Sequence, residues 1–324
     1  MSNYVYFAPI GDGWRNLAVD SYFLDNVKKG DIILYFYVNT NAVIIGRNQN
    51  AWTECNLDNL KEDSVQLVRR HTGGGAVYHD CGNLNFSFIM NASDYSQDRQ
   101  FKVILNAMHT LGIDACLSGR NDILVGEKKF SGNAFGLSKG NRAHHGTILV
   151  NSELNKLPRY LNVSQAKIKS KGISSVRSRV CNLCDYIPHI NVEMVYKTIL
   201  EAFIREYGMT CEYQFTGLEL DEVEKRYLVQ KSWEWTMGKA PKFDYTINNR
   251  FSFGEVQLNL NLRDGMIKGA KLYSDCLNIE FCDKASDQLM GVKFTASDIA
   301  SALRIVGSEE AMEVADYFET HGLQ

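Results

Sequence analysis

The 324-residue sequence lacks an excess of positive charge and lacks long apolar runs. Its formal net charge of -3 argues against a protein whose whole surface binds nucleic acid or a membrane. No run approaches the roughly 18 apolar residues of a transmembrane helix. The start, MSNYVYFAPIGDGWRNL, has neither the basic nor the apolar region of a secretory signal peptide. We therefore expect a cytoplasmic protein.

Several common motifs are also missing. The P-loop pattern GxxxxGK[ST] does not occur, and the only glycine-rich loop lacks the GxGxxG spacing of dinucleotide-binding proteins. Internal repeats and low-complexity tracts are absent as well. The eight cysteines are scattered, and the CxxC pair Cys181 and Cys184 has no second ligand pair for zinc. We expect free thiols rather than a disulfide framework or a zinc site.

What is present is an ordinary globular composition, with 45% apolar and 23% charged residues. β-branched and aromatic runs predict strands at 31–38, 42–46, 65–69 and 84–90. Helical spacing of apolar residues predicts a helix over 101–111 that ends at Gly112. A second helix is expected to begin after Asn191 and to end at Gly208. This mixture predicts an α+β protein.

The sequence changes character near residue 240. The linker Gly238–Lys242 contains a proline, and residues 255–262 then alternate between apolar and polar side chains. The pair Asp264 and Gly265 predicts a hairpin turn into a return strand at 267–273. Helices are expected around 283–289 and over 296–318. These elements predict a small α+β domain from about residue 248 to residue 324.

The stretch RRHTGGGAVYHDCGNLNFSF, residues 69–88, is the first candidate site. Three consecutive glycines allow backbone N–H groups to converge on an anion. Arg69 and Arg70 stay charged at neutral pH and are suited to bind a phosphate or carboxylate. Taken alone, a glycine run is more often a tight turn. The arginine pair makes an anion site a real alternative.

A second candidate site lies in SGRNDILVGEKKFSGNA, residues 118–134, which predicts a hairpin. It would bring the Asp122 carboxylate near the Lys129 ammonium. Asp122 is a possible Mg²⁺ ligand, and Lys129 could stabilise charge on a transferring group. The alternatives are a strand-start cap for Asp122 and a solvated edge residue for Lys129. The adjacent His144 and His145 precede another strand and point to opposite faces, so at most one reaches a shared site.

Four motifs in this order resemble the lipoate–protein ligases of the biotin/lipoate ligase superfamily: RRHTGGGAVYHDCGNLNFSF, KKFSGNAFG, HHGTILV and KGISSVRSRVCNL. The resemblance covers most of residues 14–190, and SWEW and GKAP at 232–241 resemble the end of that family's large domain. It implies a large α+β catalytic domain, residues 1–247, with mixed β-sheets flanked by helices. Residues 248–324 would form the small accessory domain.

The resemblance also implies a two-step reaction. Lipoate and ATP, with Mg²⁺, would give lipoyl-AMP and pyrophosphate. The lipoyl group would then pass to a lysine of a lipoyl domain, in a 2-oxoacid dehydrogenase E2 subunit or the glycine cleavage H protein. Lys129 would touch both the lipoyl carbonyl oxygen and the α-phosphate, and would be the catalytic residue. No nucleic-acid or membrane partner is implied.

Motif positions then give the expected binding residues. The nucleotide would contact Arg70, the backbone of Gly75, Ala76, Val77 and Tyr78, and the side chains of Asn121, Asp122 and Lys129; Asp122 is also the expected Mg²⁺ ligand. The lipoyl group would lie against Gly73, Gly74, His79, Lys129 and His145. The loop Lys171–Val180, with Arg177 and Arg179, resembles a segment that closes over the adenylate.

Two other functions stay open at this point. One is a transferase that lacks the activation step, acting on preformed adenylate or through a cysteine thioester such as Cys81 or Cys116. The other is a non-catalytic protein that binds lipoate or lipoyl domains. Retention of Arg70, Asp122 and Lys129 argues against the binding protein. The uninterrupted GGG and the accessory domain favour the full ligase over a transferase.

Overall fold

The computed structural model describes residues 2–9, 11–119, 121–162, 180–237 and 245–323. Its largest sheet has eight strands in the order β11 (Thr210–Glu212), β1 (Asn3–Phe7), β2 (Ile32–Tyr37), β6 (Asn83–Asn91), β10 (Asn141–Leu149), β9 (Lys128–Ser138), β8 (Asp122–Val125) and β7 (Ala115–Ser118). The strand β1 pairs in parallel with β11 and β2, and the remaining pairs are antiparallel. The expected α+β fold with mixed sheets is confirmed.

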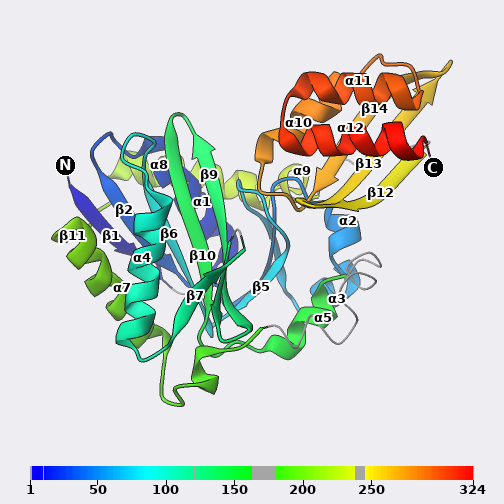
Figure 1. The fold of residues 1–324 in the computed structure, drawn as a ribbon. Helices are drawn as coiled ribbons and strands as arrows, with labels where there is room; N and C mark the ends of the chain where they lie inside the picture. The colour runs from blue at the N-terminus through cyan, green and yellow to red at the C-terminus, as the bar shows by residue number, and fades with distance from the viewer. Residues whose placement is uncertain (1, 10, 120, 163–179, 238–244, 324) are drawn as a thin grey trace.

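Helices cover both faces of this sheet. On one face α4 (Gln97–Thr110) packs against α7 (Val192–Tyr207), and on the other α1 (Gly13–Asn26) packs against α8 (Gly217–Lys231) (Figure 1). The strand β2 shows why, because its successive side chains point to opposite faces. Leu34 and Phe36 join the apolar cluster of α4 and α7, whereas Ile33 and Tyr35 join that of α1.

The two helices expected in this part are confirmed. Helix α4 is capped by the Ser96 side chain, and Gly112 follows it with a φ of +83°. Helix α7 is capped by the Asn191 side chain, which accepts from the N–H of Met194, and it ends at Gly208 with a φ of +99°. Glycine adopts this backbone conformation without strain, so both helices stop where the sequence predicts.

A smaller sheet of three strands carries the glycine motif. Its order is β4 (Gln66–Arg69), β3 (Asn41–Ile45) and β5 (Val77–Asp80). The short helices beside it are α2 (Ala51–Glu54), α3 (Leu57–Glu62), η1 (Leu154–Lys156) and α5 (Leu157–Tyr160). Residues 70–76 connect β4 to β5, so the glycine loop is anchored at both ends by strands of one sheet.

The C-terminal part contains the third sheet, in the order β12 (Tyr245–Phe251), β13 (Gly254–Arg263) and β14 (Met266–Ser274). The expected hairpin turn is confirmed, since Asp264 and Gly265 have φ angles of +53° and +72°. Three helices follow, α10 (Ile279–Gln288), α11 (Ala296–Val306) and α12 (Glu309–His321). The single helix expected over 296–318 is wrong, because Gly307 ends α11 in a left-handed conformation and Ser308 caps α12.

Two short elements, η4 (Leu183–Asp185) and α9 (Trp233–Thr236), complete the described part. Residues 171–179 of the expected closing loop and the linker Gly238–Lys242 lie outside the described residues, so their predicted roles are not addressed by the structure. The division of the chain between residues 247 and 248 stays a prediction. Among the described helices, none has the length and hydrophobicity needed to cross a bilayer.

Candidate active site

The side chains of the two adjacent arginines of the glycine motif lie in different parts of the structure. The Arg69 guanidinium donates through Nη1 to the carbonyls of Gly46, Arg47 and Gln49 at 3.0, 2.8 and 2.6 Å. Its Nη2 donates to the carbonyl of Thr236 at 2.7 Å. Arg69 therefore joins the segment after α8 to the β3–β4 region. Arg69 does not line the cavity that Arg70 lines, so the expectation that both arginines face one anion is wrong for Arg69.

Arg70 points into a cavity instead. Its Nη2 donates to the carbonyls of Gly73 and Gly75 at 2.6 and 2.9 Å, and its Nη1 donates to that of Ile44 at 3.3 Å. Burial lowers the pKa of Arg70 to about 10, so the side chain remains a cation at neutral pH. Within the described part of the chain, no carboxylate forms an ion pair with it. The hydrogen bonds that Arg70 makes within the described residues all end at backbone carbonyl oxygens.

The three glycines of the loop meet different surroundings. A Cβ atom on Gly73 would overlap the carbonyl oxygen of Cys276, which follows β14. Gly74 has a φ of +93°, and its N–H donates to the same Cys276 oxygen at 2.9 Å. A Cβ atom on Gly75 would have no neighbour within 4 Å. The loop is therefore held against the C-terminal part at its first two glycines and open at the third.

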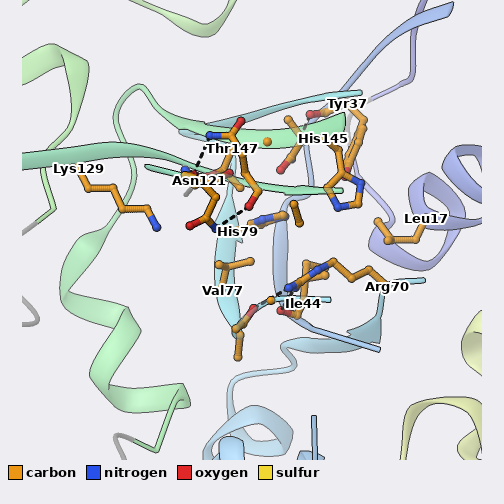
Figure 2. A pocket seen from close by; sticks show the side chains of 18 residues that line it. Leu17, Tyr37, Ile44, Arg70, Val77, His79, Asn121, Lys129, His145 and Thr147 are labelled. Atoms are coloured by element: carbon orange, nitrogen blue, oxygen red, sulfur yellow. Dashed lines mark hydrogen bonds between the residues drawn. The ribbon is translucent and has the colours of Figure 1, made fainter. Parts of the chain in front are cut away.

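Lys129 approaches the cavity from the β8–β9 hairpin, as the sequence predicts. Its ammonium lies 2.6 Å from the Asp122 carboxylate, and both side chains are about one third exposed, at 34% and 37%. A Cβ atom on Gly132 would lie 2.8 Å from the Lys129 ammonium. The missing side chain at Gly132 thus gives Lys129 room to lie over the strand. Lys129 and Arg70 reach the cavity from opposite sides (Figure 2).

Two histidines line the same cavity. His79 receives a hydrogen bond at Nδ1 from the Asn39 amide at 3.0 Å, and its buried Nε2 has no hydrogen-bond partner in the described part of the structure. Burial lowers the pKa of His79 to about 3, so the ring is neutral. His145 Nε2 lies 2.6 Å from Thr72 Oγ1, and its Nδ1 lies 3.5 Å from Asp20 Oδ2. The ring of His145 is therefore hydrogen-bonded to the glycine loop at Nε2, and its Nδ1 faces Asp20 of helix α1.

The cavity has a volume of about 170 Å³. The predicted residues that line it are Arg70, Gly74, Gly75, Ala76, Val77, His79, Asn121, Lys129 and His145 (Figure 2). Gly73 faces the C-terminal part, Asp122 lies beside Lys129, and the Tyr78 hydroxyl donates to Asn41. The motif residues thus converge from the smaller sheet and from β8, β9 and β10. Their individual roles stay predictions.

The cavity also has walls that the sequence did not predict, namely Leu17, Tyr37, Ile44, Asn85, Gly132, Asn133, Ala134, Gly146 and Thr147. Asn85 had a usable signal, because it lies in the alternating strand opposite the apolar face. That polar face is buried as well, since Asn85 and Ser87 are 1% and 0% exposed. Buried amides and hydroxyls on a strand indicate a polar site rather than solvent. Leu17 and Tyr37 carry no comparable signal.

The α+β fold, with its eight-stranded sheet and its smaller C-terminal part, is that of the lipoate ligase class. The model of the lipoyl protein ligase A/B catalytic domain matches residues 12–204. The model of the bacterial lipoate protein ligase C-terminus matches residues 240–321. The chain belongs to the lipoate–protein ligase family. The resemblance noted in the sequence is thereby confirmed.

Relatives agree over nearly the whole chain. Lipoate-protein ligase A of Psychrobacter cryohalolentis is 42% identical over 88% of this chain and 87% of its own length. The protein of the same name from Blochmanniella floridana is 38% identical over the same shares. A crystal structure of P. falciparum LipL1 in complex with lipoate superposes with a TM-score of 0.86 at 33% identity, covering 98% of this chain and 99% of that one.

Proposed function

We propose that this protein is an ATP-dependent lipoate–protein ligase. It activates lipoate to lipoyl-AMP and transfers the lipoyl group to a lysine of a lipoyl domain. The observation that carries the proposal is the Arg70 cation, which lies buried without a carboxylate partner among the described residues, across the cavity from Lys129. Such a pair is suited to bind and align two anions. The lipoate-protein ligase A relatives support this function.

The first step joins the lipoate carboxylate to the α-phosphorus of ATP. One carboxylate oxygen forms the new P–O bond while the bond to the β-phosphate breaks, and pyrophosphate leaves. Both reactants are anions, so positioning and charge neutralisation provide much of the rate. In our proposal Lys129 contacts the α-phosphate and the lipoyl carbonyl oxygen, and Arg70 contacts the nucleotide. A solved lipoate-protein ligase A with bound ATP supports the substrate assignment.

The remaining residues are assigned by their places around the cavity. We propose that the backbone of residues 75–78 contacts the nucleotide and that Asn121 contacts its ribose or phosphates. His79 and His145 would line the lipoyl end together with Gly73 and Gly74. At about 170 Å³ the cavity is smaller than ligand pockets of roughly 300–1,000 Å³. A nucleotide would therefore extend over the open rim at Gly75.

Mg²⁺ fits Asp122, whose carboxylate lies beside Lys129 next to the cavity. The ion is typically bound by one or two carboxylates together with waters and substrate phosphates, rather than by a cage of protein ligands. No group of three or more His, Cys, Asp or Glu side chains suited to a metal occurs in the described residues. Asp122 offers the single carboxylate that such a shared site needs. We propose that it holds Mg²⁺, which would neutralise phosphate charge.

The second step transfers the lipoyl group to the acceptor. The neutral lysine amine attacks the carbonyl carbon, the new C–N bond forms, and the bond to AMP breaks. Lys129 would stabilise the oxygen that becomes negative in the transition state. The proposed acceptors are E2 subunits of 2-oxoacid dehydrogenases and the glycine cleavage H protein, in the cytoplasm. A Thermoplasma acidophilum ligase solved with its E2 lipoyl domain supports this acceptor class.

A thioester mechanism is less well supported. None of the described residues that line the cavity is a cysteine. Cys81 and Cys116, the candidates for a covalent intermediate, are exposed residues outside its lining. All eight cysteines are free. The geometry thus favours direct transfer from an adenylate over an acyl-enzyme.

The decisive experiment omits the acceptor. Purified protein is mixed with lipoate, Mg²⁺ and ATP, and pyrophosphate and lipoyl-AMP are quantified beside a Lys129→Ala control. We expect both products from the native protein and a loss of about 100- to 1,000-fold in the variant. No adenylate from folded protein that binds lipoate would refute the ligase. If this protein then transferred the lipoyl group from supplied lipoyl-AMP, it would be a transferase. If it did not, it would be a binding protein.

A further inference from the structure

The neighbour of His145 on strand β10 faces the opposite side of the sheet. His144 is 0% exposed and lies among phenylalanine rings, with the Phe101 and Phe135 centroids at 4.6 and 4.9 Å. Burial lowers its pKa to about 3, so the imidazole is neutral. A neutral polar ring in an apolar core is costly unless its nitrogens are hydrogen-bonded. The partners of these nitrogens therefore decide what His144 does.

Both ring nitrogens of His144 have partners. Nε2 lies 2.9 Å from Asn133 Oδ1, and Nδ1 lies 3.1 Å from Gln100 Oε1. A neutral imidazole carries one N–H. The Asn133 amide nitrogen donates to the carbonyl of Asn121, which leaves its oxygen toward His144. We therefore assign the ring proton to Nε2, which donates to Asn133. Nδ1 then accepts a hydrogen bond only with the Gln100 amide turned by about 180°, so that its NH₂ group takes the place of Oε1.

Asn133 in turn holds the start of β8. Its side-chain nitrogen and its backbone N–H both donate to the carbonyl of Asn121, at 3.1 and 2.9 Å. The Asn121 amide donates back to the carbonyl of Asn133 at 2.7 Å. The next residue is Asp122, whose carboxylate lies 2.6 Å from the Lys129 ammonium. The hydrogen bonds thus run from the core beneath the sheet to the side chain proposed as catalytic.

The space for this connection is provided by Gly146. A Cβ atom at that position would overlap Asn133 Oδ1 and the ring of Phe86. With glycine there, the Asn133 amide can lie over Gly146, its register partner on β10, and reach His144 on the same face of the sheet. The sequence HHG therefore provides one histidine to the cavity, one to the core, and the gap that the second needs.

We propose that His144 is a positioning residue for the adenylation step, acting through Asn133 and Asn121 to hold Asp122 and hence Lys129 in place. It touches neither substrate nor reacting atoms. The inference rests on the function proposed above, because it concerns the orientation of Lys129 in that reaction. A histidine that only filled the core would be replaceable by an apolar ring of similar size without loss of turnover.

The test replaces His144 by phenylalanine, which fills the aromatic cage but cannot donate to Asn133. We expect the kcat of lipoyl-AMP formation to fall about 10- to 100-fold, with the KM for lipoate within about twofold of native, since small misplacements of catalytic groups reduce turnover at this scale. Asn133→Ser should give a similar loss if His144→Phe does not fold. The double variant should be no worse than the more impaired single variant. Unchanged kcat in folded His144→Phe, or losses that multiply, would overturn the proposal.

A second readout does not depend on activity. Competitive acetylation with acetic anhydride, read by mass spectrometry, compares Lys129 with its exposed neighbour Lys128 as internal reference. In His144→Phe we expect Lys129 to react several-fold faster relative to Lys128 than in the native protein, because its carboxylate partner is no longer held in place. An unchanged ratio would refute the positioning role. If the native protein forms no adenylate, the proposed ligase fails, while this ratio still decides whether His144 positions Lys129.

Discussion

The main sheet and the C-terminal sheet bury different chemistry. On the α1 side of β6, the buried side chains include Asn85 and Ser87, at 1% and 0% exposure. On β13 the residues facing the helices are Val256, Leu258 and Leu260, all essentially inaccessible. On these faces β6 contributes Asn85 to the wall of the cavity, whereas β13 contributes apolar side chains to a core.

The two regions differ in what their buried side chains do: one set orients polar groups, and the other stabilises the fold. Buried polar groups must be hydrogen-bonded, as Ser87 is to the Asp20 carboxylate at 2.5 Å and Asn85 to the carbonyl of Tyr37 at 3.2 Å. Such networks orient side chains but add little net free energy. The apolar C-terminal core stabilises the chain without orienting any group toward a ligand. Variants in the two regions should therefore fail in different ways.

The largest effect is expected at Arg70. We predict that Arg70→Met lowers kcat/KM for lipoyl-AMP formation by about 100- to 1,000-fold, because the buried cation facing the cavity is lost. Steady-state pyrophosphate release measures the effect. Arg70→Lys is the matched control, since it retains the positive charge but loses the planar guanidinium group. Its kcat/KM should lie between those of the native protein and Arg70→Met. Native-like turnover in Arg70→Met would remove the argument that this charge serves catalysis.

The converse effect is expected in the C-terminal core. Leu272 is fully buried there, so Leu272→Ala should lower the free energy of unfolding by about 2–5 kcal/mol. Urea denaturation measures the change. Ile305→Ala is the matched control, since that side chain is 70% exposed and the cost should stay within about 0.5 kcal/mol. Adenylate formation by folded Leu272→Ala should be native-like, and a tenfold loss would show that this core shapes the cavity.

A smaller and graded effect is expected in acid. His79 and His144 have pKa values near 3 in the folded protein, so both are neutral there, whereas the unfolded chain protonates them below pH 6.5. Protons then favour the unfolded state, and stability falls as the pH drops from 6.5 toward 3. Each histidine should contribute up to about 1.4 kcal/mol per pH unit.

Urea denaturation between pH 7 and pH 4.5 measures this slope. His79→Gln should flatten it, because this variant removes a buried ring that gains a proton on unfolding. An equal slope in native protein and His79→Gln would show that the buried ring does not govern the acid response.

Local patterns predicted much of this molecule. The alternation in β13, the Asp264–Gly265 turn and the ends of α4 and α7 all depend on neighbouring residues, so the sequence contains their determinants. The break at Gly307 was missed because a single glycine is tolerated inside a helix, and only its left-handed conformation reveals the stop.

The cavity was predictable only in part. The motif residues converge because strand order brings β4, β5 and the β8–β9 hairpin together, which no single motif encodes. Arg69 and Arg70 are identical in type and adjacent, and both donate to backbone carbonyls, yet of the two Arg70 alone lines the cavity. Which face of a strand meets a third element depends on tertiary packing. For the same reason Tyr37 and Asn133 were not predicted as cavity residues.

The unequal surroundings of the three glycines matter for anyone who wishes to redesign substrate choice. Gly73 lies against the Cys276 carbonyl. Most variants in a library at position 73 would therefore lose the packing between the glycine loop and the C-terminal part. Gly75 borders the cavity in open space, and no positive φ restricts what may stand there. Substitutions at residue 75 would place a side chain next to the ligand, whereas substitutions at residue 73 would disrupt the packing of the glycine loop against the C-terminal part.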